Sequence, residues 1–251
     1  MLSERERERY GRQILLFGEE GQERLKEAEI FIAGAGGLGS PVSIYLAVAG
    51  VGTLTVVDSD VVDQTNLNRQ ILHRDRDIGE RKAVSAGEKL RELNPDVNIR
   101  ALDTHIGEEN AGVLVGEADG IVDAMDNFPT RYLLNRVAIA KGIPLFHGAI
   151  RGMYGQATTI IPGKTPCLAC IFPKAPPGEV FPVVGVTPGL IGMVQATEVL
   201  KFLLGEGDLL ANRLLLWDGM LAQASEIRVE RNPHCRECGD GETKERRGRE
   251  R

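Results

Sequence analysis

The sequence predicts an α/β protein with a doubly wound, mainly parallel sheet that antiparallel strands continue. Three observations lead to this fold class. Apolar runs alternate with amphipathic segments from residue 30 to residue 149, which is typical of strands joined by right-handed helical crossovers. These runs are continuous, as in strands that are covered on both faces. After residue 150, apolar and polar residues alternate, which indicates half-exposed antiparallel strands.

Local signals predict the individual elements. Apolar residues recur among the charges of residues 3–27, which predicts one or two helices. Pro41 suits the first turn of a helix, Pro95 ends a second helix and Gly142 closes a third. The parallel strands are expected at residues 30–34, 53–58, 97–102, 120–126 and 143–149. The helices between them are expected at residues 40–50, 80–94, 108–117 and 129–142.

The last third of the chain has a different character. Half-exposed strands are expected at residues 154–163 and 224–231, and a helix at residues 190–205. The segment 172–189 holds five prolines and is expected to form a long crossing loop. The boundaries that we expect are a single domain over residues 1–241, divided into parts 1–165 and 166–241, and a disordered charged tail over residues 242–251.

Composition narrows the function classes. The chain has 251 residues, of which 42% are hydrophobic, and a net charge of −6. An acidic balance makes a nucleic-acid-binding protein unlikely, because such proteins present basic surfaces. The amino-terminal segment has no apolar signal core, and no apolar stretch approaches the ~20 residues that span a bilayer. We therefore expect a cytoplasmic protein without a membrane segment.

A glycine-rich turn indicates a nucleotide site. The stretch "IFIAGAGGLGS" joins an expected strand to an expected helix and holds Gly34, Gly36, Gly37 and Gly39. Backbone N–H groups of such a turn approach phosphate oxygens, and the helix amino end adds positive potential. Asp58 ends the next strand, where a carboxylate can accept both ribose hydroxyls. Residues 1–165 are thus expected to be a Rossmann-like nucleotide-binding part. A packing turn is the alternative, and the pattern does not separate NAD from ATP.

Polar residues after the second and fourth strands favour ATP. Asn66, Arg69 and Gln70 follow the second strand, and Lys82 lies near the start of the next helix. Cations that converge on a nucleotide suggest charge neutralisation on a triphosphate, although each could also be a solvated surface charge. Asp126 ends the fourth strand at the ligand-binding edge of the sheet, where it could hold Mg²⁺ or cap the following helix.

The four cysteines form two C-x-x-C pairs. The pairs are Cys167 with Cys170 and Cys235 with Cys238. Two such turns complete a closed tetrahedral Zn²⁺ site, so we expect structural zinc rather than a redox pair. His234 adjoins Cys235 but is not needed as a ligand. The remaining histidines stand alone, with no serine or cysteine near them in a triad-like pattern, and receive no role; they are His73, His105 and His147.

With these motifs in place, the sequence resembles the MoeB/ThiF/HesA family, the bacterial and archaeal relatives of ubiquitin-activating enzymes. The likeness runs from "RYGRQILL" to "NPHCRECG", nearly the whole chain. It rests on R-Y-x-R-Q, G-x-G-G-L-G, D-x-D, N-L-x-R-Q, Lys82, D-A-M-D-N, G-Q-x-T and the paired C-x-x-C. Within the family, molybdopterin-synthase adenylyltransferases are the nearest match.

The resemblance implies a homodimer that binds ATP and Mg²⁺ together with the carboxyl-terminal Gly-Gly tail of a small ubiquitin-like (β-grasp) sulfur carrier. The tail carboxylate would attack the α-phosphorus, pyrophosphate would leave, and an acyl-adenylate would remain. By position, Asp58 would hold the ribose and Asp126 would hold Mg²⁺, and Arg12 would reach into the neighbouring subunit's site. The residues implied for the nucleotide are Gly37, Asp60, Asn66, Arg69, Gln70, Lys82 and Asn127.

One departure from the family pattern affects the expected product. Many relatives carry a further cysteine in the crossing loop, which would fall near Gly178 in this chain. Here no such cysteine exists, so we expect the reaction to stop at the adenylate. Three alternatives stay open: an adenylating tRNA-modification dehydratase, an NAD(P)-dependent oxidoreductase, and a catalytically silent scaffold for a ubiquitin-like partner.

Overall fold

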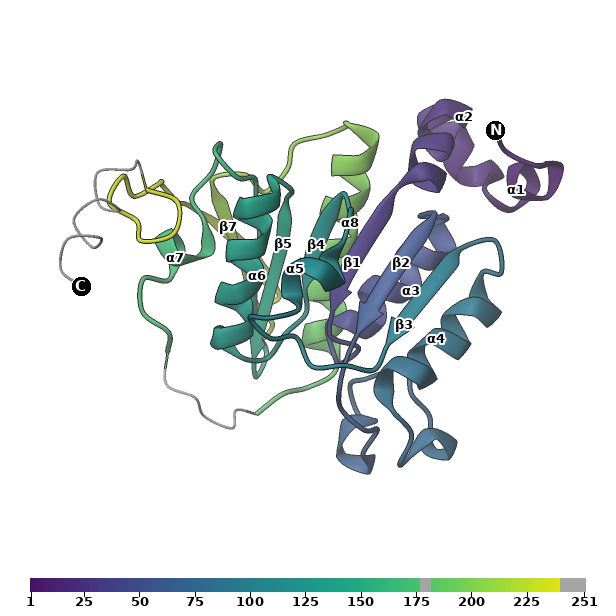
Figure 1. Cartoon of the computed structure of the whole chain (residues 1–251), viewed down its shortest axis with the longest axis horizontal. Helices are drawn as coiled ribbons and strands as arrows, with labels where there is room; N and C mark the ends of the chain where they lie inside the picture. Colours follow the sequence, from purple (N-terminus) through teal and green to yellow (C-terminus); the bar gives the residue numbers. More distant parts are fainter. Residues whose placement is uncertain (177–181, 240–251) are drawn as a thin grey trace.

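Five parallel strands form one side of the sheet, and three antiparallel strands continue it on the other (Figure 1). The computed structural model describes residues 1–176 and 182–239, so the expected tail at 242–251 and the position of Gly178 lie outside the described residues. The strand order is β3-β2-β1-β4-β5-β6-β7-β8. The strands are β1 (Glu29–Ala33), β2 (Thr53–Val57), β3 (Asn98–Leu102), β4 (Gly120–Asp123), β5 (Leu145–Arg151), β6 (Tyr154–Ile160), β7 (Arg213–Asp218) and β8 (Gln223–Arg228).

Helices cover both faces of the parallel strands, as the continuous apolar runs predict. One face packs against α3 (Gly39–Ala49), α4 (Lys82–Leu93) and α8 (Val186–Leu204). The other packs against α5 (Ala111–Val115) and α6 (Phe128–Lys141). Strand β1 shows why, because Ile30 and Ile32 enter the first core and Phe31 enters the second. All three side chains are fully buried.

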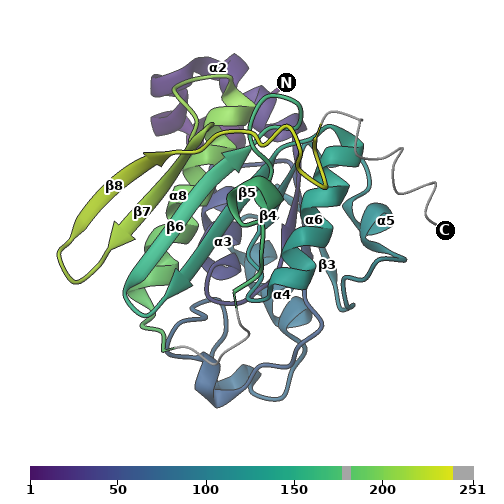
Figure 2. The same cartoon turned by 90° about the vertical axis from the view of Figure 1, so that its left-hand side faces the viewer.

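The structure differs from the expectations for the last third of the chain at three places. Strand β7 is present although only one strand was predicted after α8; its run "RLLLWD" lacks the alternation that marks the neighbouring half-exposed strands. Figure 2 shows β7 and β8 side by side at the end of the sheet. Helix α8 begins at Val186 rather than at residue 190, because Pro188 lies in its first turn, where a missing N–H group costs no hydrogen bond. A short helix, α7 (Leu168–Ile171), was also not predicted.

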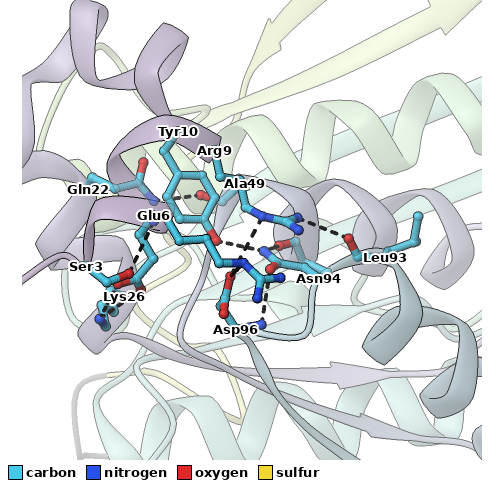
Figure 3. A network of polar contacts seen from close by, with 12 residues as sticks. Ser3, Glu6, Arg9, Tyr10, Gln22, Lys26, Ala49, Leu93, Asn94 and Asp96 are labelled. Carbon is cyan, nitrogen blue, oxygen red and sulfur yellow. Dashed lines mark hydrogen bonds and ion pairs between the residues drawn. The ribbon is translucent and has the colours of Figure 1, made fainter.

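The two amino-terminal helices, α1 (Glu4–Arg9) and α2 (Gly11–Glu27), are anchored to the carboxyl end of α3 (Figure 3). Asn94 donates hydrogen bonds of 2.7 Å to both the Tyr10 hydroxyl and the Ala47 carbonyl. Gln22 donates to the Ala49 carbonyl at 2.9 Å. These carbonyls belong to the last turn of α3, where the Ala47 carbonyl also accepts from the Gly50 N–H at 3.1 Å. Gln22 thus ties α2 to the end of α3 directly, and Asn94 ties Tyr10 to it indirectly.

No helix in residues 1–176 and 182–239 has the length and apolar character that crossing a membrane requires.

Candidate functional site

A cavity of about 500 Å³ opens where the strand order reverses, between the carboxyl ends of β1 and β4. Open α/β sheets bind ligands at such a switch point. Loops after β1, β2, β3 and β4 all contribute to its wall. The wall includes most of the residues expected to contact nucleotide: Gly34, Gly36, Gly37, Asp58, Asp60, Arg69, Gln70, Lys82, Asp126 and Asn127.

In the glycine turn, neighbouring backbone segments approach too closely to leave room for side chains. Gly34 has a φ of +102°, and a Cβ atom there would lie 2.9 Å from the Ala124 carbonyl oxygen. At Gly39 a Cβ atom would lie 1.9 Å from the Gly34 carbonyl oxygen, so this glycine serves the packing of the turn itself. Within the described residues, the N–H groups of Gly36 and Gly37 have no hydrogen-bond partner. Two open donors at the start of α3 can receive an anion.

Asp58 is held in place at the end of β2. One carboxylate oxygen accepts a hydrogen bond from the Ala35 N–H at 2.8 Å, and the other accepts one from the Asp60 N–H at 2.8 Å. Each oxygen keeps a lone pair for a further donor, since a carboxylate has about four acceptor sites. The side chain is thus fixed in orientation and can still accept hydroxyl groups of a ligand.

The two expected cations are at the cavity wall. The Lys82 ammonium lies 2.8 Å from an Asp60 carboxylate oxygen and is buried, whereas Asp60 is exposed. Arg69 donates to the Thr65 carbonyl at 2.8 Å and to the Asn68 side-chain oxygen at 3.0 Å. Both cations contact oxygen atoms of the protein that oxygen atoms of a phosphate could replace.

A buried amide beside these cations is incompletely satisfied. The Gln70 side-chain oxygen is buried and has no hydrogen-bond partner among the described residues. Leaving such an acceptor unpaired is costly, so this atom suits a donor from a bound ligand. The cavity therefore fits a nucleotide on three independent counts: open N–H donors, paired cations and an unsatisfied acceptor.

Three expected residues do not line this cavity. Gly39 is needed for packing, as shown above. The Asn66 side-chain oxygen accepts the Asp63 N–H at 3.2 Å and caps a short 3₁₀ turn. Arg12 is exposed on α2, and within the described part of the chain it makes no hydrogen bond or ion pair.

Asp126 is free of the capping role that local sequence left open. The cap of α6 is Asn127, whose side-chain oxygen accepts the Thr130 N–H at 2.9 Å. Asp126 instead lines the cavity, where its carboxylate faces the same space as the glycine turn. Carboxylate oxygens are ligands that Mg²⁺ prefers.

Sequence reasoning missed a buried charged cluster beneath Asp126. Asp123 is fully buried, accepts a hydrogen bond from Nδ1 of His147 at 2.7 Å, and lies 3.7 Å from the Arg131 guanidinium. Arg131 also donates to the Met125 carbonyl at 3.1 and 2.5 Å. Burial lowers the pKa of His147, which therefore stays neutral. The available signal was a histidine inside the apolar run "IPLFHGA", since a buried polar side chain needs a partner.

A second, larger cavity adjoins the first. It has a volume of about 840 Å³ and lies against β5, β6, β7 and the start of α6. Aromatic and proline side chains line much of it, among them Phe128, Phe172 and Trp217. The two cavities share four wall residues: Asp126, Asn127, Arg131 and Ile150. A ligand in the apolar cavity can thus place one end beside Asp126.

The four cysteines meet where α7 lies against the segment that follows β8. Cys167 Sγ lies 3.9 Å from Cys170 Sγ and 3.6 Å from Cys235 Sγ, and Cys170 Sγ lies 3.4 Å from Cys238 Sγ. All four sulfur atoms lie within 4.8 Å of one another, and no disulfide joins them. Four thiolates around a tetrahedral Zn²⁺ at ~2.3 Å would be about 3.8 Å apart, so the cluster can hold a metal ion. Burial raises the pKa of the Cys170 thiol to about 11.

Comparison with known proteins places these features in a family. The model of the ThiF family matches residues 10–237. The SAMP-activating enzyme E1 of Haloferax volcanii is 47% identical over 93% of this chain and 89% of its own. The sulfur carrier protein adenylyltransferase of Thermus thermophilus is 45% identical over 95% of this chain and 93% of its own. Mouse adenylyltransferase and sulfurtransferase MOCS3 is 42% identical, and this chain spans about half of it (53%).

Solved structures agree on the fold. Escherichia coli MccB is 23% identical, with a TM-score of 0.85 over 95% of this chain and 74% of its own. PaaA is also 23% identical, with a TM-score of 0.79 over 91% of this chain and 75% of its own. At these identities the likeness shows the fold alone. The match of the family model to most of the chain and the two relatives above 40% identity show that this chain belongs to the ThiF family.

Proposed function

We propose that this protein is an ATP-dependent adenylyltransferase that activates the carboxyl-terminal Gly-Gly carboxylate of a small ubiquitin-like (β-grasp) sulfur carrier. The observation that carries the proposal is the junction of the two cavities at Asp126 and Arg131. One cavity offers open N–H donors and cations for a polyphosphate, and the other offers an apolar channel for an extended peptide. The relatives named for sulfur carrier activation support this choice of substrate.

The chemistry needs charge neutralisation rather than a base. A tail carboxylate is ionised at neutral pH, so no proton has to be removed. Its oxygen forms a bond to the α-phosphorus while the bond from that phosphorus to the bridging oxygen breaks, and pyrophosphate leaves with the electron pair. Arg69 and Lys82 offset the repulsion between the anions and stabilise charge on the leaving oxygen. One contact of this kind is often worth about 2.7–4 kcal/mol of barrier.

Asp126 would hold Mg²⁺ at the junction. When bound there, the ion would neutralise charge between phosphate oxygens. Arg131 fixes the backbone beside this carboxylate through the Met125 carbonyl. Asn127 holds the following residues by capping α6, so the carboxylate stands between two anchored segments.

The absence of a further thiol sets the end of the reaction. All four cysteines of the chain belong to the cysteine cluster described above. With no cysteine left to accept the activated carrier, the product is the acyl-adenylate, and a separate sulfur donor acts on it. A family member with a free cysteine in the crossing loop would instead bind the carrier covalently through that cysteine.

We propose a homodimer in which Arg12 enters the neighbouring subunit's cavity. Arg12 does not line the cavity of its own chain. On the same helix, Leu15 and Leu16 are 84% and 81% exposed. Contact of this face of α2 with a second copy would cover both leucines. Mixing Arg12→Ala with Asp126→Ala tests it, because mixed dimers would regain one intact site. No recovery, together with a single-copy mass in solution, would contradict the dimer.

The cysteine cluster is proposed to hold structural zinc. The ion would join α7 to the segment after β8. A single domain for parts 1–165 and 166–241 is proposed on the one sheet that runs through both, because β6 pairs with β5 and with β7. The expected end of this domain at residue 241 lies outside the described residues. A closed set of four thiolates leaves no open position for catalysis.

Carrier-dependent exchange of pyrophosphate into ATP tests the proposed function. The protein is incubated with ATP, Mg²⁺ and candidate carriers, and intact mass is measured for an added AMP. Exchange should require the carrier's Gly-Gly tail. Asp126→Asn should abolish it, whereas Asp208→Asn, at an exposed carboxylate outside both cavities, should not. Stabilisation by NADH but not by ATP would instead indicate an oxidoreductase.

A further inference from the structure

His73 is a buried histidine that the proposed reaction does not use. Its ring is 5% exposed and lies between the glycine turn and helix α4. Nε2 is 3.0 Å from the Ala35 carbonyl oxygen, and Nδ1 is 2.9 Å from the Ser85 hydroxyl. The ring therefore bridges the turn that faces the cavity and the helix that begins with Lys82.

The partners fix the protonation of the ring. A carbonyl oxygen only accepts, so Nε2 carries the proton and donates it to Ala35. In the neutral ring Nδ1 accepts from the Ser85 hydroxyl, whose oxygen also accepts from the Lys89 ammonium at 2.8 Å. Lys89 is itself held 2.6 Å from a buried Asp77 carboxylate. In this series of hydrogen bonds every group donates toward the glycine turn: Lys89 to Ser85, Ser85 to His73 and His73 to Ala35.

The environment keeps the ring neutral. Burial is the largest effect and lowers the pKa of His73, and the positive charges of Lys82 and Lys89 lower it further. The contact with the Ala35 carbonyl and the charge of Asp58 act in the opposite direction without cancelling the effect. A neutral ring with one N–H group fits both hydrogen bonds.

The contact with Ala35 determines where the next N–H group points. A trans peptide is planar, and its C=O and N–H groups point in opposite directions. His73 at 3.0 Å, with a longer contact of 3.4 Å from the Ser40 hydroxyl, holds the Ala35 carbonyl toward the interior. The Gly36 N–H is therefore directed to the opposite side of that plane. This is one of the two donors that have no partner within the described residues. The Ala35 N–H is held independently by Asp58 at 2.8 Å.

We propose that His73 is a positioning residue: its Nε2–H group orients the Ala35–Gly36 peptide so that the Gly36 N–H is presented to a ligand phosphate, and its bond to Ser85 ties that peptide to the helix that carries Lys82. The phosphate donors of the turn and the cation of α4 are therefore set at a fixed separation. The inference rests on the proposed function, because it assumes that the cavity binds ATP.

Two substitutions of similar size separate this role from simple packing. In His73→Gln the amide nitrogen can occupy the place of Nε2 and donate to Ala35. In His73→Asn the amide reaches only the place of Nδ1 and can satisfy Ser85 alone. The dissociation constant for ATP, measured by calorimetry with Mg²⁺ and without carrier, should rise about tenfold for His73→Asn, as expected when one hydrogen bond is lost. It should stay within about twofold of the unsubstituted protein for His73→Gln, since the donor is retained.

The same ATP-binding measurements test the positioning role of His73 separately from the proposed function. If the unsubstituted protein does not bind ATP, the proposed function is wrong. If it binds ATP and His73→Asn binds equally well, or if His73→Gln is weakened as much as His73→Asn, the positioning role is wrong. Melting temperatures and metal content serve as fold controls. Should His73→Asn not fold, Ser85→Ala carries the test, because it removes the hydroxyl that fixes the ring; weaker ATP binding is expected, and unchanged binding overturns the role.

Discussion

Replacing Arg131 by methionine should destabilise the protein far more than a like replacement elsewhere on α6. The Arg131 side chain is 6% exposed and Asp123 is fully buried, and their closest atoms are 3.7 Å apart. Methionine keeps most of the volume and removes the charge. Asp123 would then keep only His147 and the Met125 N–H as hydrogen-bond partners. Its charge would be buried without a cation, which typically costs about 3–5 kcal/mol.

Arg136 supplies the matched control. It lies on the same helix, and its side chain is 38% exposed. It pairs with Glu108, which is 75% exposed, and lies 3.9 Å from the carboxylate of Glu237, which is 15% exposed. Exposed pairs of this kind contribute about 0–1 kcal/mol. In a chain of this length, 1 kcal/mol shifts the melting temperature by about 2–4 °C, so Arg131→Met should lower it by roughly 6–20 °C and Arg136→Met by at most about 4 °C.

Urea unfolding and calorimetry at pH 7 measure both variants. Similar free energies of unfolding for the two variants would refute the reasoning, because they would mean that Asp123 does not depend on Arg131. A variant that is too unstable to purify at 25 °C can be tested at lower temperature. The exchange activity of Arg131→Met should also fall at temperatures where it is folded, since the Met125 carbonyl beside Asp126 loses its donor.

The remaining predictions concern the metal, the product and the amino terminus. Cys235→Ser should lower both bound zinc and the melting temperature, because zinc ligation contributes folding energy; equal zinc content would contradict the ligand assignment. Incubation with ATP and carrier should give an AMP adduct on the carrier and no conjugate that dithiothreitol cleaves, as intact-mass spectra before and after reduction will show. Glu6 is held by Lys26, and although burial alone would raise its pKa, this contact and the hydrogen bonds from Ser3 lower it from 4.5 to about 2. Its folded pKa is below its unfolded pKa, so its stabilising effect is complete above about pH 4.5 and is lost as the pH falls toward 2. Glu6→Gln should therefore lower the melting temperature at pH 7 and much less at pH 3; an equal loss at both values would argue against the ion pair.

Much of the fold could be predicted because its signals are local. The run that contains Ile30, Phe31 and Ile32 is apolar on both sides, which already implies helices on both faces. The gathering of most of the expected site residues around one cavity could also be predicted, since the carboxyl ends of parallel strands meet at one edge and gather the residues that follow them.

What could not be predicted depends on contacts between distant segments. Asp123 and His147 are opposite each other only because β4 and β5 pair in that register. His73 meets Ala35 across 38 positions of sequence, and no spacing rule relates the two. Asp126 and Asn127 were both plausible caps for α6, and only the hydrogen bond to Thr130 decides between them.

The hydrogen bonds that Gln22 and Asn94 donate to the end of α3 have a practical consequence for anyone preparing this protein. Helix α3 has its amino end at the glycine turn, so both ends of one short helix are under constraint. Trimming the chain before residue 11 would remove Tyr10, uncover Asn94 and loosen the helix at the end opposite the nucleotide. If the cavity binds ATP as proposed, we expect shortened preparations to bind it more weakly although the cavity wall is unchanged.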